Sequence, residues 1–157
     1  MKIKNKGFTL IELIVVIAII AVLSGIILFS VSQYINRGKD SNISGSLAIL
    51  VPAGEIFYNN NGNSYNDGAS FCDPEKNSVI KNIILQMPPN SSGSCGTNVA
   101  GVCCYAESQA WAACAREFAN SNLAYCVDSR AMKKEICNSS CADNITICPD
   151  NDTAFCN

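Results

Sequence analysis

A long apolar run near the beginning of the chain is its clearest pattern. Residues 8–29 read FTLIELIVVIAIIAVLSGIILF and contain one charged residue, Glu12. As an α-helix this run would extend ~33 Å, which is enough to cross the hydrocarbon core of a bilayer. Three positive residues precede it, and positive charges hold the start of a span on the cytoplasmic side: Lys2, Lys4 and Lys6. The pattern therefore predicts a single-pass membrane helix with the rest of the chain outside the cytoplasm.

A second apolar pattern follows, with the spacing of a helix that is buried on one side. The stripe consists of Ile43, Leu47, Leu50, Gly54 and Phe57. We expect one helix from about Phe8 to about Asn60, whose second half packs on a globular head. Pro52 lacks an N–H group, so two helices with a break near this residue are the alternative. The Asn-rich and Gly-containing residues 59–63 should end the helix.

The remaining residues predict a small head built from short elements. Residues 73–86 predict a short helix with Asp73 as its N-cap and Pro74 at its first position, stopped by the prolines at 88 and 89. Three short apolar runs predict strands of an antiparallel sheet: residues 102–106, 110–115 and 124–127. From Ala131 onward we expect an irregular tail. The fold class is therefore α+β, with a long amino-terminal helix packed on a small antiparallel sheet.

Cysteine and histidine content restrict the chemistry. The chain has 157 residues and no histidine, which excludes Ser-His-Asp triads, Cys-His dyads and His-based metal sites. All ten cysteines lie between residues 72 and 156, a density typical of a disulfide-rich extracytoplasmic domain. They are Cys72, Cys95, Cys103, Cys104, Cys114, Cys126, Cys137, Cys141, Cys148 and Cys156.

The pairing of these cysteines cannot be read from the sequence, but their positions restrict it. Cys103 and Cys104 are adjacent in a predicted strand, so they should point to opposite faces and take different partners. Cys137 and Cys141 could join each other or reach one of three other cysteines: Cys126, Cys148 or Cys156.

Metal and nucleic-acid sites are poorly supported by the sequence. Structural zinc sites use CxxC-like pairs, whereas this chain offers CC and CxxxC in an oxidising location. Three acids in the tail could give oxygen ligands to calcium, but they lack EF-hand spacing and a solvated loop is favoured: Asp143, Asp150 and Asp152. The formal charge is −2, and the basic cluster Arg130, Lys133 and Lys134 is flanked by acids, so nucleic acid is not an expected partner. We expect no cofactor and no enzymatic activity.

The first residues carry a resemblance to a known family. The segment Gly7-Phe8-Thr9-Leu10-Ile11-Glu12-Leu13 resembles the signal of type IV prepilins and of type II secretion pseudopilins. That signal has a short basic leader, Gly, an aromatic residue and Glu at the fifth position after the cut. The resemblance implies that a prepilin peptidase and methyltransferase cuts between Gly7 and Phe8 and methylates the new amine. Removal of three lysines would take the formal charge from −2 to −5.

The same resemblance implies a domain plan and a function. The leader would be residues 1–7, the transmembrane and filament-core helix 8–29, the amphipathic helix 30–62 and the cysteine-rich head 63–157. The chain would be a structural subunit of a type IV pilus-like filament. It would lie in the cytoplasmic membrane before assembly, with its amino terminus inside and its head outside, and the assembly machinery would then place it in a filament on the cell surface.

Two sets of residues would then serve assembly with other subunits. Glu12 would pair with the Phe8 amine of a neighbour, and because both charges are desolvated, a mispaired register would be costly. Three small residues would let helices approach closely: Ala18, Ala21 and Gly25. The alternatives are a pseudopilin of a type II secretion system, or a membrane-anchored extracytoplasmic binding domain that does not polymerise.

Overall fold

The computed structural model describes residues 7–88, 101–142, 144–150 and 156, without the side chain of Phe29. The chain divides into two units, residues 1–35 and 36–157. Helix α1 (Leu10–Asn60) is one continuous helix, which confirms the expected single helix, and Pro52 lies inside it on an exposed position. Among the described residues, α1 is the one helix that is long and apolar enough to cross a membrane.

The end of α1 follows from its turn-forming residues. The helix ends at Asn60, and Gly62 and Asn63 both have positive φ angles, 64° and 60°. The Asn63 N–H reaches back to the carbonyl oxygen of Tyr58 at 3.0 Å, which satisfies an acceptor of the last turn. The predicted stop at residues 59–63 is therefore confirmed.

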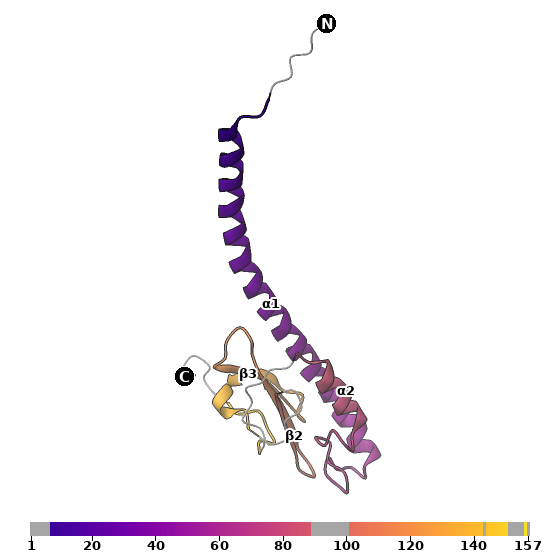
Figure 1. Ribbon diagram of the computed structural model, residues 1–157. Helices are drawn as coiled ribbons and strands as arrows, with labels where there is room; N and C mark the ends of the chain where they lie inside the picture. Colours follow the sequence, from indigo (N-terminus) through magenta and orange to yellow (C-terminus); the bar gives the residue numbers. More distant parts are fainter. Residues whose placement is uncertain (1–6, 89–100, 143, 151–155, 157) are drawn as a thin grey trace. The chain divides into compact units, whose positions relative to one another are not determined.

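The second unit contains a four-stranded antiparallel sheet (Figure 1) with strand order β1-β2-β3-β4. Its strands are β1 (Val102–Ala106), β2 (Trp111–Arg116), β3 (Leu123–Asp128) and β4 (Lys133–Cys137), and a short 3-10 helix (Asn138–Ser140) follows. Three strands were predicted, whereas β4 corrects the expected irregular tail. Charged residues dominate β4 and only Ile136 is buried in it, which is typical of an edge strand and hides its periodicity.

The two faces of the sheet bury different sets of residues. One face packs against α1 and a second helix, α2 (Ser78–Gln86), and Leu47 and Leu50 of the predicted stripe lie in the same core as Trp111 of β2. The other face carries a smaller core that is rich in cysteine: Cys103, Cys114, Ala124, Cys126, Ile136 and Cys148. The sheet is therefore covered by helices on one side and by disulfide-linked segments on the other.

Helix α2 (Ser78–Gln86) is shorter than predicted, because Asn77 rather than Asp73 caps it. The Asn77 side-chain oxygen accepts the N–H groups of Val79 at 3.1 Å and Ile80 at 3.4 Å. Asp73 instead accepts the Glu75 N–H at 2.9 Å and so holds a turn before the helix. The Asn77 amide also donates to the carbonyl of Phe71 at 3.0 Å, which fixes the cap in the core and decides where the helix begins.

Candidate functional site

The first turn of α1 holds the predicted assembly residue, Glu12, in a capping box. Its Oε2 atom accepts the Thr9 N–H at 2.8 Å and the Thr9 hydroxyl at 2.7 Å. The Glu12 N–H donates in return to Thr9 Oγ1 at 3.3 Å. This reciprocal arrangement satisfies donors that the first turn of a helix leaves open. The Thr-x-x-Glu spacing was present in the sequence, and the sequence interpretation missed it.

The apolar part of α1 is exposed throughout the first unit. Every described side chain from Phe8 to Leu28 is exposed, including Leu10 at 75 % and Leu28 at 71 %. The three small residues predicted to serve helix packing lie in this stretch, and a Cβ at Gly25 would meet no atom within 4 Å. Phe8, Ile11, Glu12, Val15 and Val16 line a shallow hollow beside the carboxylate. Among the described residues of the first unit, no other element covers this surface.

Four disulfides link described cysteines of the head. The pairs are Cys72–Cys104, Cys114–Cys141, Cys126–Cys148 and Cys137–Cys156, and no described cysteine is free. Cys103 and Cys104 lie in cores on opposite faces of the sheet, as their adjacency predicted. Cys137 takes one of its predicted partners, whereas Cys141 joins Cys114, which was not among them. A 3-10 helix (Asn138–Ser140) lies between Cys137 and Cys141, and the Cys141 disulfide joins the end of this helix to Cys114 of β2.

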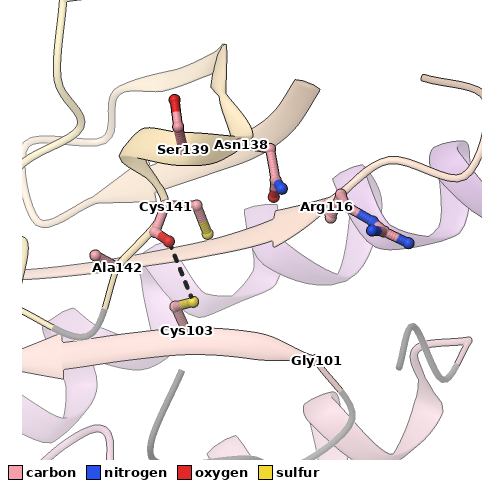
Figure 2. A pocket seen from close by; sticks show the side chains of 7 residues that line it. All are labelled: Gly101, Cys103, Arg116, Asn138, Ser139, Cys141 and Ala142. Carbon is pink, nitrogen blue, oxygen red and sulfur yellow. Dashed lines mark hydrogen bonds between the residues drawn. The ribbon is translucent and has the colours of Figure 1, made fainter. Parts of the chain in front are cut away.

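Cys103 and Cys141 line a cavity beneath the 3-10 helix (Figure 2). The sulfurs of Cys103, Cys114 and Cys141 all lie within 4.8 Å of one another, and the Cys103 sulfur is 3.7 Å from the carbonyl oxygen of Cys141. A zinc ion requires thiolates. Cys114 and Cys141 are joined in a disulfide and Cys103 is also disulfide-bonded, so these atoms cannot act as thiolate ligands in this state.

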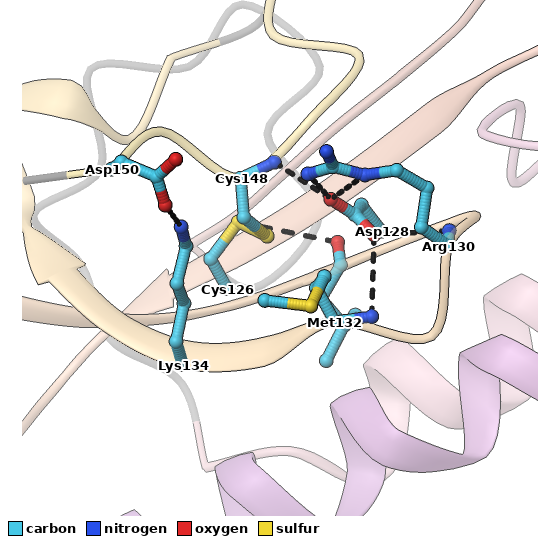
Figure 3. Close-up of polar contacts among 8 residues, drawn as sticks. Cys126, Asp128, Arg130, Met132, Lys134, Cys148 and Asp150 are labelled. Atoms are coloured by element: carbon cyan, nitrogen blue, oxygen red, sulfur yellow. Dashed lines mark hydrogen bonds and ion pairs between the residues drawn. A yellow bond between two sulfur atoms is a disulfide. The ribbon is translucent and has the colours of Figure 1, made fainter.

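Two residues of the predicted basic cluster, Arg130 and Lys134, form ion pairs with acids of the head (Figure 3). Asp128 is fully buried and accepts the Arg130 guanidinium at 2.6 Å and the Cys148 N–H at 3.0 Å. Burial alone would raise the pKa of Asp128, but these hydrogen bonds outweigh it and hold the pKa below its usual value. Lys134 pairs with Asp150, the one predicted calcium residue that is described; Asp143 and Asp152 lie outside the described residues.

A second carboxylate arrangement joins α1 to the end of β2. Asp40 is 5 % exposed and its two oxygens accept the backbone N–H groups of Phe118 at 2.6 Å and Ala119 at 3.0 Å. Lys39 covers the Phe118 ring at 4.6 Å from its centroid. The sequence did not single out Asp40, because the helical pattern marks apolar faces but gives no sign of a carboxylate that binds a loop.

Comparison with known proteins finds similarity in the amino-terminal part of the chain. A family described as "Prokaryotic N-terminal methylation motif" matches residues 2–28. The chain is 51% identical over 44 residues to "Type IV major alpha-pilin" of Moraxella bovis, with 28% of each chain covered. It is 37% identical over 71 residues to "Probable minor fimbrial protein" of Dichelobacter nodosus, with 45% of each covered. The aligned segments thus span less than half the length of these curated relatives, and no solved structure matches.

Proposed function

We propose that this chain, whose amino-terminal segment is similar to those of type IV pilins, is a structural subunit of a type IV pilus-like filament. The observation that carries the proposal is the methylation motif at residues 2–28, which leads directly into an apolar helix exposed on every side. A soluble monomer rarely leaves an apolar surface of this size uncovered. Lipid would cover it in the precursor, and the same helix of other copies would cover it in the filament.

Processing would convert the precursor into an assembly-competent subunit. A prepilin peptidase would cut between Gly7 and Phe8, both of which precede the helix and are exposed. The cut removes the basic leader but keeps α1 attached, unlike an ordinary secretory signal. The new amine at Phe8 then places a positive charge four residues before Glu12.

Glu12 has two tasks in this proposal. Its Oε2 atom caps the helix through Thr9, as the hydrogen bonds at 2.8 and 2.7 Å support. These contacts use Thr9 and not the Phe8 amine that cleavage would create, so that amine stays available to a neighbouring copy. Both charges would be desolvated between packed helices, where an unpaired charge costs several kcal/mol. The pair would thereby select one axial offset between subunits.

The test measures processing and polymerisation separately. We expect the wild-type protein from cells to begin at a methylated Phe8 by mass spectrometry and to form filaments visible by electron microscopy. Glu12→Leu should still insert into the membrane but yield few filaments. Ser24→Leu, which also exchanges a polar residue of the apolar run for leucine, is the matched control and should keep them.

One result would refute the filament function, and another would refute the pairing of Glu12 with Phe8. An intact Met1 on the protein from cells would identify a plain membrane anchor carrying an extracytoplasmic domain. Normal filaments from Glu12→Leu would show that the pair with Phe8 is not required for assembly. Short filaments confined to the cell envelope would favour the pseudopilin alternative.

A further inference from the structure

A cavity between α1 and the sheet contains a buried carboxylate, one oxygen of which has no hydrogen-bond partner in the described part of the chain. The side chains that line it come from α1, from the segment that follows β2 and from β3: Arg37, Asp40, Ser41, Ser44, Glu117, Ala119 and Tyr125. Glu117 is only 6 % exposed, and its Oε1 atom has no hydrogen-bond partner among the described residues. A buried, unpaired charge of this kind is costly, so the group has to bind either a proton or a cation.

The surroundings of Glu117 favour a cation. From α1 it faces Asp40, from β3 the Tyr125 hydroxyl, and from β4 Glu135. Burial, and then the charges of Glu135 and Asp40, raise the pKa of Glu117 to about 7. Asp40 is already satisfied by two backbone N–H groups and Glu135 is exposed, so Glu117 is the buried member of this acidic set with an unsatisfied oxygen among the described residues. Arg37 also lines the cavity, but its side chain is exposed.

The oxygen atoms around this cavity fit an ammonium group, which would donate hydrogen bonds to them, better than they fit a metal ion. A calcium ion takes six to eight oxygen ligands, usually from several carboxylates. Among the described residues, the three sulfurs near Cys103 are the only group of three potential metal ligands within reach of one another. An ammonium group has only three donors to place, and the Glu117 carboxylate with the hydroxyl groups of Ser44 and Tyr125 offers enough acceptors.

We propose that this cavity receives a primary ammonium group, which the Glu117 carboxylate binds, and that a lysine side chain of a second copy supplies it. The second copy as the source rests on the proposed filament function. In such a filament the same subunit repeats, and each interface joins two different patches of one chain. Three lysines of the described head are exposed and able to reach a neighbour: Lys76, Lys81 and Lys133.

The ammonium site itself is tested on the full-length protein in detergent micelles. The probe is n-butylammonium chloride, followed by the ¹³C resonance of the Glu117 carboxyl, which Glu117→Gln assigns. We expect the amine to shift this resonance and lower its titration midpoint, with binding about tenfold weaker at pH 6 than at pH 8 because fewer carboxyls are ionised. Sodium chloride at equal ionic strength should have no such effect, and the exposed Glu107 is the control carboxyl.

Three outcomes would overturn this site. Equal shifts with butylammonium and sodium would show a salt effect, and a shift with calcium chloride alone would show a metal site. If Arg37 folded over Glu117 in solution, no added amine would bind, and removal of Arg37 by Arg37→Gln would restore the shift. Each result excludes a receptor for an external ammonium group in the wild-type chain.

The source of the ammonium group needs a second measurement. Filaments grown from mixed ¹⁴N and ¹⁵N subunits are treated with a carbodiimide, which joins a carboxylate to a contacting lysine. We expect a peptide that links Glu117 to a lysine and carries both isotopes, and its loss in Glu117→Gln. Links within one isotope only would overturn the second copy as the source. Failure of the filament proposal looks different, because wild-type subunits would then form no filaments although butylammonium still binds in micelles.

Discussion

Gly54 of α1 faces the indole ring of Trp111 so closely that a Cβ atom at position 54 would lie 2.7 Å from Trp111 Nε1. Trp111 is fully buried and contacts Phe71 with ring centroids 4.7 Å apart. The absence of a side chain at Gly54 is therefore what allows α1 to approach strand β2. The sequence stripe counted Gly54 as part of the buried face, but the reason for glycine there appears only when the partner is known.

Replacement of Gly54 should therefore destabilise the head. Gly54→Ala improves helix propensity but forces the indole ring or the helix to move, and overpacking of this kind costs about 1–3 kcal/mol. Gly45→Ala is the matched control, since a Cβ at Gly45 meets no atom within 4 Å and should stabilise α1 by up to about 1 kcal/mol. Denaturant unfolding of the oxidised protein measures both. Equal effects of the two variants would contradict the close approach.

Asp128 should be the most costly acid of the head to neutralise. Asp128→Asn keeps the shape but removes the charge that holds Arg130 and the Cys148 N–H, and hydrogen bonds to a charged group are worth about 1.5–3 kcal/mol. Because the folded-state pKa of Asp128 is lowered, its contribution is present above the unfolded-state pKa and is lost as the pH falls through the folded value. The difference from wild type should thus shrink in acid. The exposed Asp67→Asn should show neither effect.

Glu117 should have the opposite dependence on pH. Its folded-state pKa of about 7 lies above the ordinary value of 4.5, so the folded chain holds its proton more tightly. The cost of ionising it begins above about pH 4.5 and is complete above about pH 7, and by the size of the shift it reaches at most about 3 kcal/mol. Glu117→Gln should therefore stabilise isolated subunits at pH 8 but not at pH 4. Thermal unfolding at both pH values measures this, and equal stabilisation at both would refute the buried charge.

The parts of the fold that the sequence predicted are those with strong periodicity. The apolar run and the stripe through Leu47 and Leu50 predicted α1, because helical spacing over many turns is a repeated signal. Strand β4 carries one buried residue, Ile136, so its periodicity was too short to detect. The helix cap moved from Asp73 to Asn77 because both residues suit a cap, and only the hydrogen bond from Asn77 to Phe71 decides between them.

The candidate sites also differ in whether the sequence could predict them, according to how far apart their residues lie along the chain. The Gly7-Phe8 and Glu12 motif is local in sequence, so it was visible without a structure. The cavity at Glu117 depends on residues almost eighty positions apart, since Asp40 binds the backbone at Phe118. Disulfide partners are equally distant in sequence. Cys141 is bonded to Cys114 of strand β2 and not to a cysteine near it in the tail. Distances of this kind follow from packing and not from a pattern along the chain.

The two tasks assigned to Glu12 can be separated through Thr9. Thr9→Val keeps the size of the side chain but loses the hydroxyl that donates to Glu12 and accepts its N–H, whereas Thr9→Ser keeps both contacts. Loss of an N-cap costs about 1 kcal/mol, so amides of residues 10–12 should exchange faster in Thr9→Val, by hydrogen exchange in micelles.

Filament yield then decides which task matters for assembly. If capping were the only task of Glu12, Thr9→Val and Glu12→Leu would reduce the number of filaments equally. If Glu12 also pairs with the Phe8 amine of a neighbour, Glu12→Leu should be much more severe, because Thr9→Val leaves the carboxylate and its charge in place. Electron microscopy of both variants beside Thr9→Ser measures the difference, and filament yields that match in Thr9→Val and Glu12→Leu would leave the pairing without support.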